Sequence, residues 1–235
     1  MCFNQTTSLI TFSISLVCSV YLLYYGISHK NNYDLFAAVL TLLIGSMQLI
    51  EYFLWGNQTC STANHRFSLL IMAVLFLQVV LGSIVFMYLF ASKSDRMFSN
   101  MIWLLIGFFT LFTLYLLYWL NQQRLCSKPM GGSCRLVWAP FQTLVNDSYG
   151  RILFLIFFSL YFFLGYYAFG GCQWLTGKMF DGHFKYPLRY SLLSFTFMAA
   201  ALYAFLTNGK NVVDIFGSTW CFLAVAFGLV SVFHW

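Results

Sequence analysis

The sequence predicts an all-α polytopic membrane protein, a seven-helix transmembrane bundle with short loops. Of its 235 residues, 61% are hydrophobic and only 8% are charged, whereas a soluble domain carries about 25% charged residues. The apolar residues gather in long stretches, and a helix needs about 20 of them to cross a bilayer. These stretches do not alternate in the way that the strands of a membrane β-barrel, about 10 residues each, would require. Lipid is therefore the expected solvent, and helices are the expected elements.

Charged residues or Gly/Asn-rich turns bound each apolar stretch, which fixes the predicted spans. In order, these are residues 8–27, 35–55, 67–90, 101–120, 152–170, 190–206 and 215–235. The first span follows a lead without basic residues or a clear cleavage site, so we interpret it as a retained helix. The sixth span is the shortest. Because the loops are short, successive helices should run antiparallel, and residues 1–235 should form a single transmembrane domain.

The loop at residues 121–151 is the one long connection. It contains Pro129 and a Gly-Gly pair between Cys126 and Cys134, a pattern typical of a turn or a small hairpin. The following segment, LVWAPFQTLV at residues 136–145, is apolar. We expect this segment to lie in the membrane interface.

Glu51, the only glutamate of the chain, falls inside the predicted span 35–55. Gln48 precedes it by three residues and Trp55 follows it by four, so the three side chains share one helix face. An acidic group in a membrane helix is costly and usually faces a bundle interior or a water-filled cavity. This stripe is the first candidate for a functional site.

Other polar residues are expected near the same end of the bundle, which we call the N-terminal side. The ligand-binding or ion-binding candidates that accompany Glu51 and Gln48 are Tyr115, Tyr118, Ser218, Cys221 and Cys2. This clustering favours a polar cavity, open to the N-terminal side, that binds or passes a small solute or ion. The alternative is that Glu51 reaches the interface and pairs with a loop residue such as Arg66.

Two other classes of function remain open. A membrane-embedded enzyme could use Cys2 and Glu51, with a metal ion whose ligands the sequence does not identify. A structural protein of a membrane or a viral envelope would need no site. The sequence has no His pair at helical spacing and no C-x-x-C, G-x-S-x-G or phosphate loop. It therefore lacks the common motifs of zinc, redox, serine-hydrolase and phosphate-binding enzymes.

The sequence also indicates which cofactors and partners to expect. The last span has no Lys for a retinal Schiff base, so retinal is not expected, and no other cofactor is predicted. No run of Lys and Arg suggests binding to nucleic acid. The expected partners are the lipid bilayer and a small solute or ion.

The orientation in the membrane rests on sequons and cysteines, because basic residues divide equally between the two sides. All three glycosylation candidates fall on the N-terminal side: Asn4, Asn57 and Asn146. Four cysteines do so as well: Cys2, Cys60, Cys126 and Cys134. An extracellular or lumenal N-terminus would allow a Cys126–Cys134 disulfide, or one from Cys60 to the long loop.

The two ends of the chain carry a set of short motifs. These are Met1-Cys2-Phe3, the stripe of Gln48, Glu51 and Trp55, and Trp220-Cys221-Phe222. Together they resemble an uncharacterised family of small multi-span membrane proteins. Asn4 and Tyr52 depart from that pattern, where Ser and Gly are usual, and a bulkier Tyr52 would narrow any cavity beside Glu51. The resemblance picks out residues and implies no activity.

Overall fold

A computed structural model describes residues 4–90, 96–129, 136–168 and 225–233. This part of the chain is helical apart from a minimal hairpin. The labelled helices are α1 (Gln5–Ser28), α2 (Asn32–Gly56), α3 (Thr62–Phe90), α4 (Arg96–Asn121), α5 (Ala139–Asn146) and α6 (Ser148–Ala168). Residues 225–232 form a seventh helical segment. Strands β1 (Lys128–Pro129) and β2 (Leu136–Val137) pair antiparallel, which agrees with the hairpin expected in the long loop.

Five of the helices, α1 to α4 and α6, are long and apolar enough to cross a membrane. They coincide with the first five predicted spans and confirm them as long apolar helices. The predicted span 190–206 lies outside the described residues. The last predicted span, 215–235, is described only at residues 225–233, where most of it is helical.

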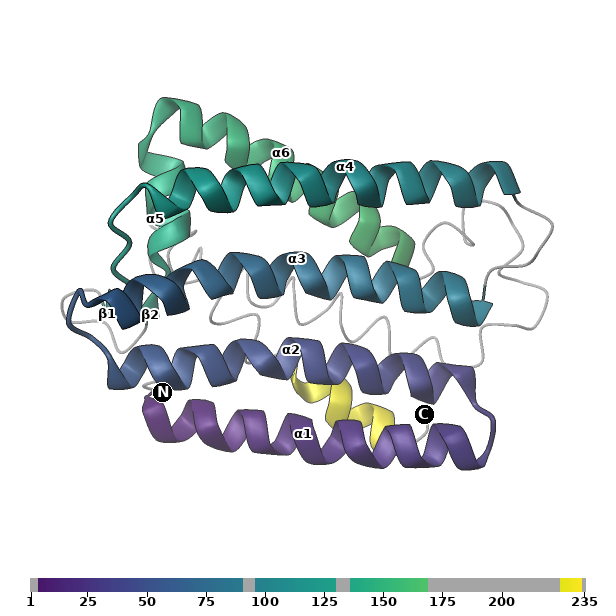
Figure 1. Ribbon diagram of the computed structural model, residues 1–235. Coiled ribbons are helices and arrows are strands. Elements are labelled where there is room, and N and C mark those ends of the chain that lie inside the picture. Colours follow the sequence, from purple (N-terminus) through teal and green to yellow (C-terminus); the bar gives the residue numbers. More distant parts are fainter. Residues whose placement is uncertain (1–3, 91–95, 130–135, 169–224, 234–235) are drawn as a thin grey trace, which may run out of the picture.

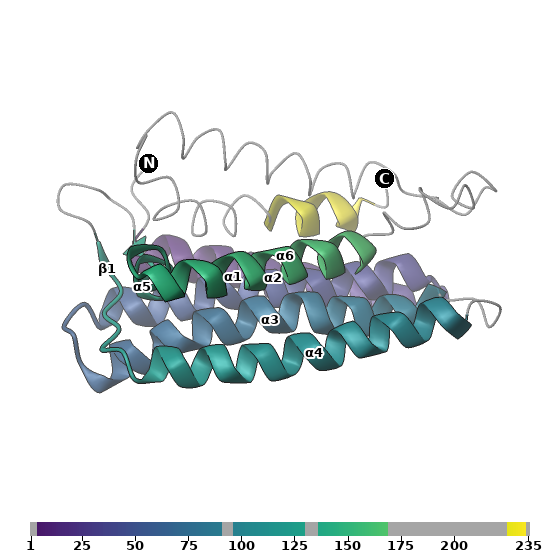
Figure 2. The same cartoon turned by 90° about the horizontal axis from the view of Figure 1, so that it is seen from above.

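The helices form two layers. Figure 1 shows α1 to α4 side by side in a row, with successive helices running in opposite directions, as short loops require. Figure 2 shows that α6 and the segment 225–232 lie behind this row. Helix α6 contacts both α3 and α4, and Gly228 lies against Thr41 of α2. The core therefore lies between the row and this second layer.

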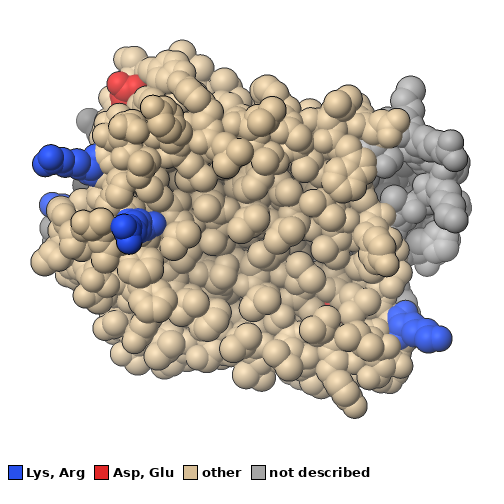
Figure 3. Space-filling model, in the orientation of Figure 1, with Lys and Arg blue, Asp and Glu red and all other residues tan. Residues whose placement is uncertain are grey.

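The outward faces of α1, α4 and α6 carry large apolar side chains. Val17 is 69% exposed, Leu104 76% and Leu155 65%. In Figure 3, Lys, Arg and acidic side chains on the visible face gather at its two ends and leave an uncharged band between them. An uncharged band with many large exposed apolar side chains is typical of contact with a membrane, so we infer that these faces contact the lipid bilayer.

Polar side chains in the core join the helices. Gln78 of α3 donates to the Leu43 carbonyl of α2 (3.1 Å) and accepts from the Tyr161 hydroxyl of α6 (3.2 Å). Ser19 of α1 donates to the Ala38 carbonyl of α2 (2.8 Å). Such bonds hold helices together where lipid gives no hydrophobic driving force.

Small residues allow α1 and α2 to approach closely. The α1 face toward α2 is built mainly of buried small residues, namely Ser8, Thr11, Ser15, Cys18, Ser19 and Gly26. At Gly45 of α2, a β-carbon would overlap the Ser15 side chain. This close packing of small residues is a common way for membrane helices to associate.

We expect the substitution Gly45→Ala to lower the free energy of unfolding by about 1–3 kcal/mol, the usual cost of overpacking. Gly107→Ala is the matched control, because nothing lies within 4 Å of a β-carbon there, and alanine favours a helix by up to ~1 kcal/mol. Unfolding in mixed micelles, followed by circular dichroism, measures the free energy of unfolding of both variants. Equal effects of the two substitutions would contradict the close α1–α2 contact.

Candidate functional site at Glu51

Glu51 is buried near the C-terminal end of α2, with 2% of its surface exposed. Its Oε1 accepts a hydrogen bond from the Trp138 indole (3.0 Å), and its Oε2 accepts one from the Gln48 amide (3.1 Å). Arg66 is exposed at the start of α3. The alternative in which Glu51 reaches the interface to pair with Arg66 is therefore not what the structure shows. Both carboxyl oxygens have neutral donors.

Helix α2 places Gln48 and Glu51 on its buried side. The helix begins at an Asn31 cap, whose Oδ1 accepts from the Tyr33 amide (3.1 Å), as is usual for such caps. An apolar run follows with no helix breaker, and the helix ends at Gly56. The spacing of three residues brings the Gln48 amide to the carboxyl group, which agrees with the stripe expected from the sequence.

Trp138 comes from the long loop, immediately before α5. It is 1% exposed, and its ring packs edge-on against Phe141 at 5.4 Å between centroids. The expectation that residues 136–145 lie in the membrane interface stays a prediction. The structure adds that most of the apolar side chains of this segment are buried within the protein. The buried residues are Leu136, Val137, Trp138, Ala139, Pro140, Phe141 and Leu144. Contacts of α5 with α3 and α6 hold the segment in the bundle.

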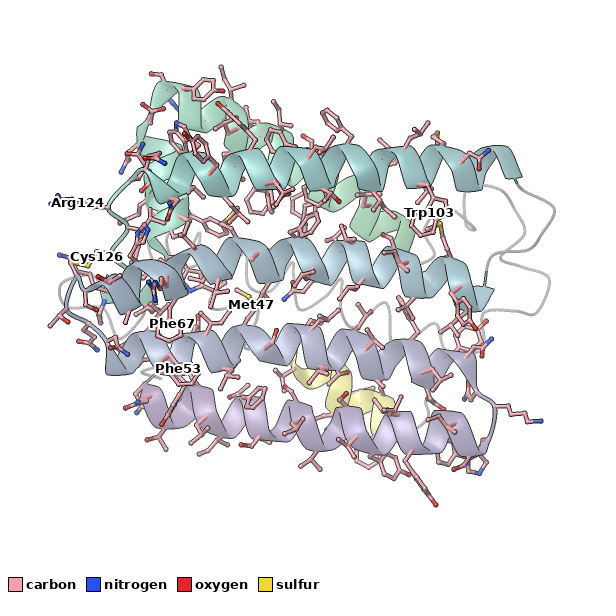
Figure 4. The ribbon with its side chains drawn as sticks, in the orientation of Figure 1. Met47, Phe53, Phe67, Trp103, Arg124 and Cys126 are labelled. Carbon is pink, nitrogen blue, oxygen red and sulfur yellow. A yellow bond between two sulfur atoms is a disulfide. The ribbon has the colours of Figure 1, made fainter. Side chains whose placement is uncertain are left out.

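A disulfide attaches the long loop to the start of α3. Of the two pairings that the sequence left open, the structure shows the one from Cys60 to the loop, as a Cys60–Cys126 bond. Cys126 is therefore not available to Cys134, which lies outside the described residues. Figure 4 shows Cys126 at the same end as the stacked rings of Phe53 and Phe67, which join α2 to α3 at 5.0 Å between centroids.

Asn64 of α3 forms a second attachment beside the disulfide. Its Nδ2 donates to the Ser127 carbonyl (2.8 Å) and to the Asn57 carbonyl. Its Oδ1 accepts from the Ser127 amide (2.8 Å) and from the Ser68 hydroxyl (3.3 Å). The Ser127 hydroxyl in turn accepts from the Ala139 amide (3.0 Å), next to Trp138. Asn64, Ser68 and Ser127 are all fully buried.

Three buried polar atoms near Glu51 have no hydrogen-bond partner among the described residues. They are the Gln48 Oε1, the Trp55 Nε1 and the Ser8 Oγ. Ser15 lies against Gly45, and Gln5 lies close to Gly56. This antiparallel register places Ser8 at the level of Glu51. Buried polar groups usually find a partner, so these three atoms are exceptions among the described residues, and the Gln48 Oε1 belongs to the side chain that donates to Glu51.

Two of the other predicted site residues, Tyr115 and Tyr118, are not brought to Glu51. Tyr115 is 45% exposed and Tyr118 is 66% exposed, and their helix, α4, packs on α3 and α6. The Tyr115 hydroxyl instead pairs with that of Tyr149 (2.8 Å). Three further candidates lie outside the described residues: Cys2, Ser218 and Cys221. The enzymatic alternative depends on Cys2, so the structure does not test it.

Trp138, Asn64 and Ser127 are the site residues that sequence reasoning missed. The signal for Trp138 was an indole in an apolar segment, since a buried indole usually finds a hydrogen-bond acceptor. Within the described ranges, no group of three or more His, Cys, Asp or Glu residues is placed to hold a metal ion. Comparison of the chain with family models, curated proteins and solved structures finds no match.

Proposed function

We propose that this protein is an integral membrane protein that binds a proton or a small cation at Glu51, and passes it or a coupled solute through the bundle. The main support is a buried carboxyl group in a membrane-spanning helix whose hydrogen-bond partners, Trp138 and Gln48, are both neutral. Ionisable groups in such positions usually serve ion or proton pathways.

The charge of the Glu51 carboxyl group decides how costly its burial is. Burying an ionised carboxylate is costly unless a cation balances it. Two neutral donors stabilise the anion only in part, so a proton or a small cation would remove the remaining cost. The unpartnered oxygens of Gln48 and Ser8 add acceptors suited to a cation, and a Glu51–Gln48 pair can also share a proton if the Gln48 amide is turned over.

The proposed orientation places the N-terminal side in an extracellular or lumenal compartment. The Cys60–Cys126 disulfide supports this, because such bonds persist in oxidising compartments. Two of the predicted glycosylation sites, Asn4 and Asn146, are exposed. The side-chain nitrogen of the third, Asn57, donates to the Phe53 carbonyl (2.8 Å), so we expect Asn57 to be the least modified of the three.

We expect Glu51→Gln to abolish proton or sodium flux into proteoliposomes, measured with a trapped pH-sensitive dye and with radioactive sodium. The substitution keeps the size of the side chain and an oxygen that can accept from Trp138, but removes the charge. Asp34→Asn is the matched control, because Asp34 is also fully buried in α2, at the opposite end, and it should retain flux.

Both variants are first checked for assembly by gel filtration and by the presence of the Cys60–Cys126 disulfide. If Glu51→Gln assembles and conducts as the unchanged protein does, the proposed function is wrong. That result would favour the structural alternative, in which the Trp138–Glu51 hydrogen bond only attaches α5 to α2.

A further inference from the structure

Part of the long loop lies against the start of α3 and ends at Trp138. We call this part, residues 122–129 and 136–138, the cover segment. Two neighbouring attachments hold this segment. One is the Cys60–Cys126 disulfide. The other is the set of hydrogen bonds between Asn64 and Ser127, with a Ser68–Ser127 hydroxyl contact of 2.7 Å.

A short path connects these attachments to Glu51. Cys126 and Ser127 are adjacent in sequence, and the Ser127 hydroxyl accepts from the Ala139 amide (3.0 Å). Ala139 follows Trp138, whose indole donates to Glu51 (3.0 Å). The disulfide end of the cover segment is therefore linked to the indole on the carboxyl group, in addition to the contacts of α5 with α3 and α6. The hydrogen bonds at Ser127 alone would each contribute only about 0.5–1.5 kcal/mol.

We propose that the cover segment is a disulfide-held strap, and that thiol–disulfide exchange at Cys60–Cys126 controls access from the aqueous phase to Glu51. Cys60 is exposed and Cys126 is half-buried, so a dithiol can reach the bond. A thiolate of the dithiol attacks one sulfur and the second thiol completes the exchange. The S–S bond accepts two electrons and two protons to give two cysteine thiols, and the dithiol leaves as its own disulfide.

Control of access by the disulfide does not depend on ion binding by Glu51. It requires only that water-soluble reagents reach the carboxyl group after reduction and not before. The test therefore measures chemical modification rather than flux. A water-soluble carbodiimide with glycinamide converts an accessible carboxyl group to an amide, with the carbodiimide leaving as a urea. Mass spectrometry of the α2 peptide then reports the labelled fractions of Glu51 and Asp34 separately.

We expect dithiothreitol to raise the labelling rate of Glu51 in proteoliposomes about tenfold, a change equivalent to ~1.4 kcal/mol, and to leave Asp34 unchanged. The double variant Cys60→Ser/Cys126→Ser should show the high rate without any reductant and should not respond to it. Asn64→Ala, which retains the disulfide, should give an intermediate rate.

Two outcomes would overturn the proposal. Glu51 could be labelled at the same rate with and without reductant in the unchanged protein. Alternatively, Glu51 and Asp34 could become labelled together, which would show a general loosening of the bundle rather than release of the strap. The Asp34 carboxyl group, at the other end of the same helix, thus distinguishes local opening from unfolding.

Discussion

Replacing Trp138 with Ala is expected to lower the free energy of unfolding by about 3–5 kcal/mol, the range for deleting a buried Trp side chain. Trp138 is 1% exposed and packs against Phe141. Its loss would also leave Glu51 Oε1 without its donor, and a buried acceptor that loses its partner costs a further ~1–3 kcal/mol. Unfolding in mixed micelles, followed by circular dichroism, measures the total.

Two controls separate packing from hydrogen bonding. Trp138→Phe keeps most of the ring and removes the indole donor, so it should cost only about 1–3 kcal/mol. Trp103→Ala removes a side chain that is 49% exposed on α4, and it should cost less than Trp138→Ala because less surface is buried there. If Trp138→Ala and Trp103→Ala proved equally destabilising, the buried position of Trp138 would be contradicted.

Replacing Asn64 with Leu is expected to have the second largest effect, about 3–5 kcal/mol, because several buried groups lose their partners at once. These are the Ser127 amide and carbonyl, the Asn57 carbonyl and the Ser68 hydroxyl. Leucine has the same branched shape and a larger volume, so it leaves no cavity, and the effect would arise from the lost hydrogen bonds and from overpacking. The same unfolding experiment measures it.

Asn32→Ala is the matched control for this substitution. Asn32 is exposed and donates one hydrogen bond, to the Leu89 carbonyl (3.0 Å), so its loss should cost no more than ~1 kcal/mol. Asn64→Leu should also increase proteolysis of the long loop in the intact protein. An Asn64→Leu protein as stable as the Asn32→Ala protein would contradict the buried attachment of the loop to α3.

The first five long apolar helices could be predicted because their signal is local. Each is a long apolar run with charge or turn residues at its ends, and backbone groups in lipid must be satisfied within the segment. The pairing of Gln48 with Glu51 was predictable for the same reason, since a spacing of three residues on a helix makes the two side chains neighbours.

The remainder of the site could not be predicted, because it depends on contacts between distant segments. The sequence left two pairings open for Cys126. Proximity in sequence favours Cys134, since a short loop costs less entropy to close, yet the structure pairs Cys126 with Cys60, 66 residues away. The sequence also offered Tyr115 and Tyr118 as partners of Glu51, because all three are expected at a similar depth in the membrane. Depth does not determine which face of α4 points inward, and the packing of α4 against α3 and α6 leaves both tyrosines exposed.

The sequence alone therefore determined that the chain forms helices long and apolar enough to cross a membrane, with a carboxyl group in the second of them. Only the tertiary structure decided what that carboxyl group contacts. Trp138 lies 87 residues from Glu51 along the chain. It belongs to a loop that the disulfide and Asn64 attach to α3, and that the contacts of α5 with α3 and α6 hold in the bundle. Helical periodicity is a local property, whereas the position of a loop is set by the sum of its buried contacts.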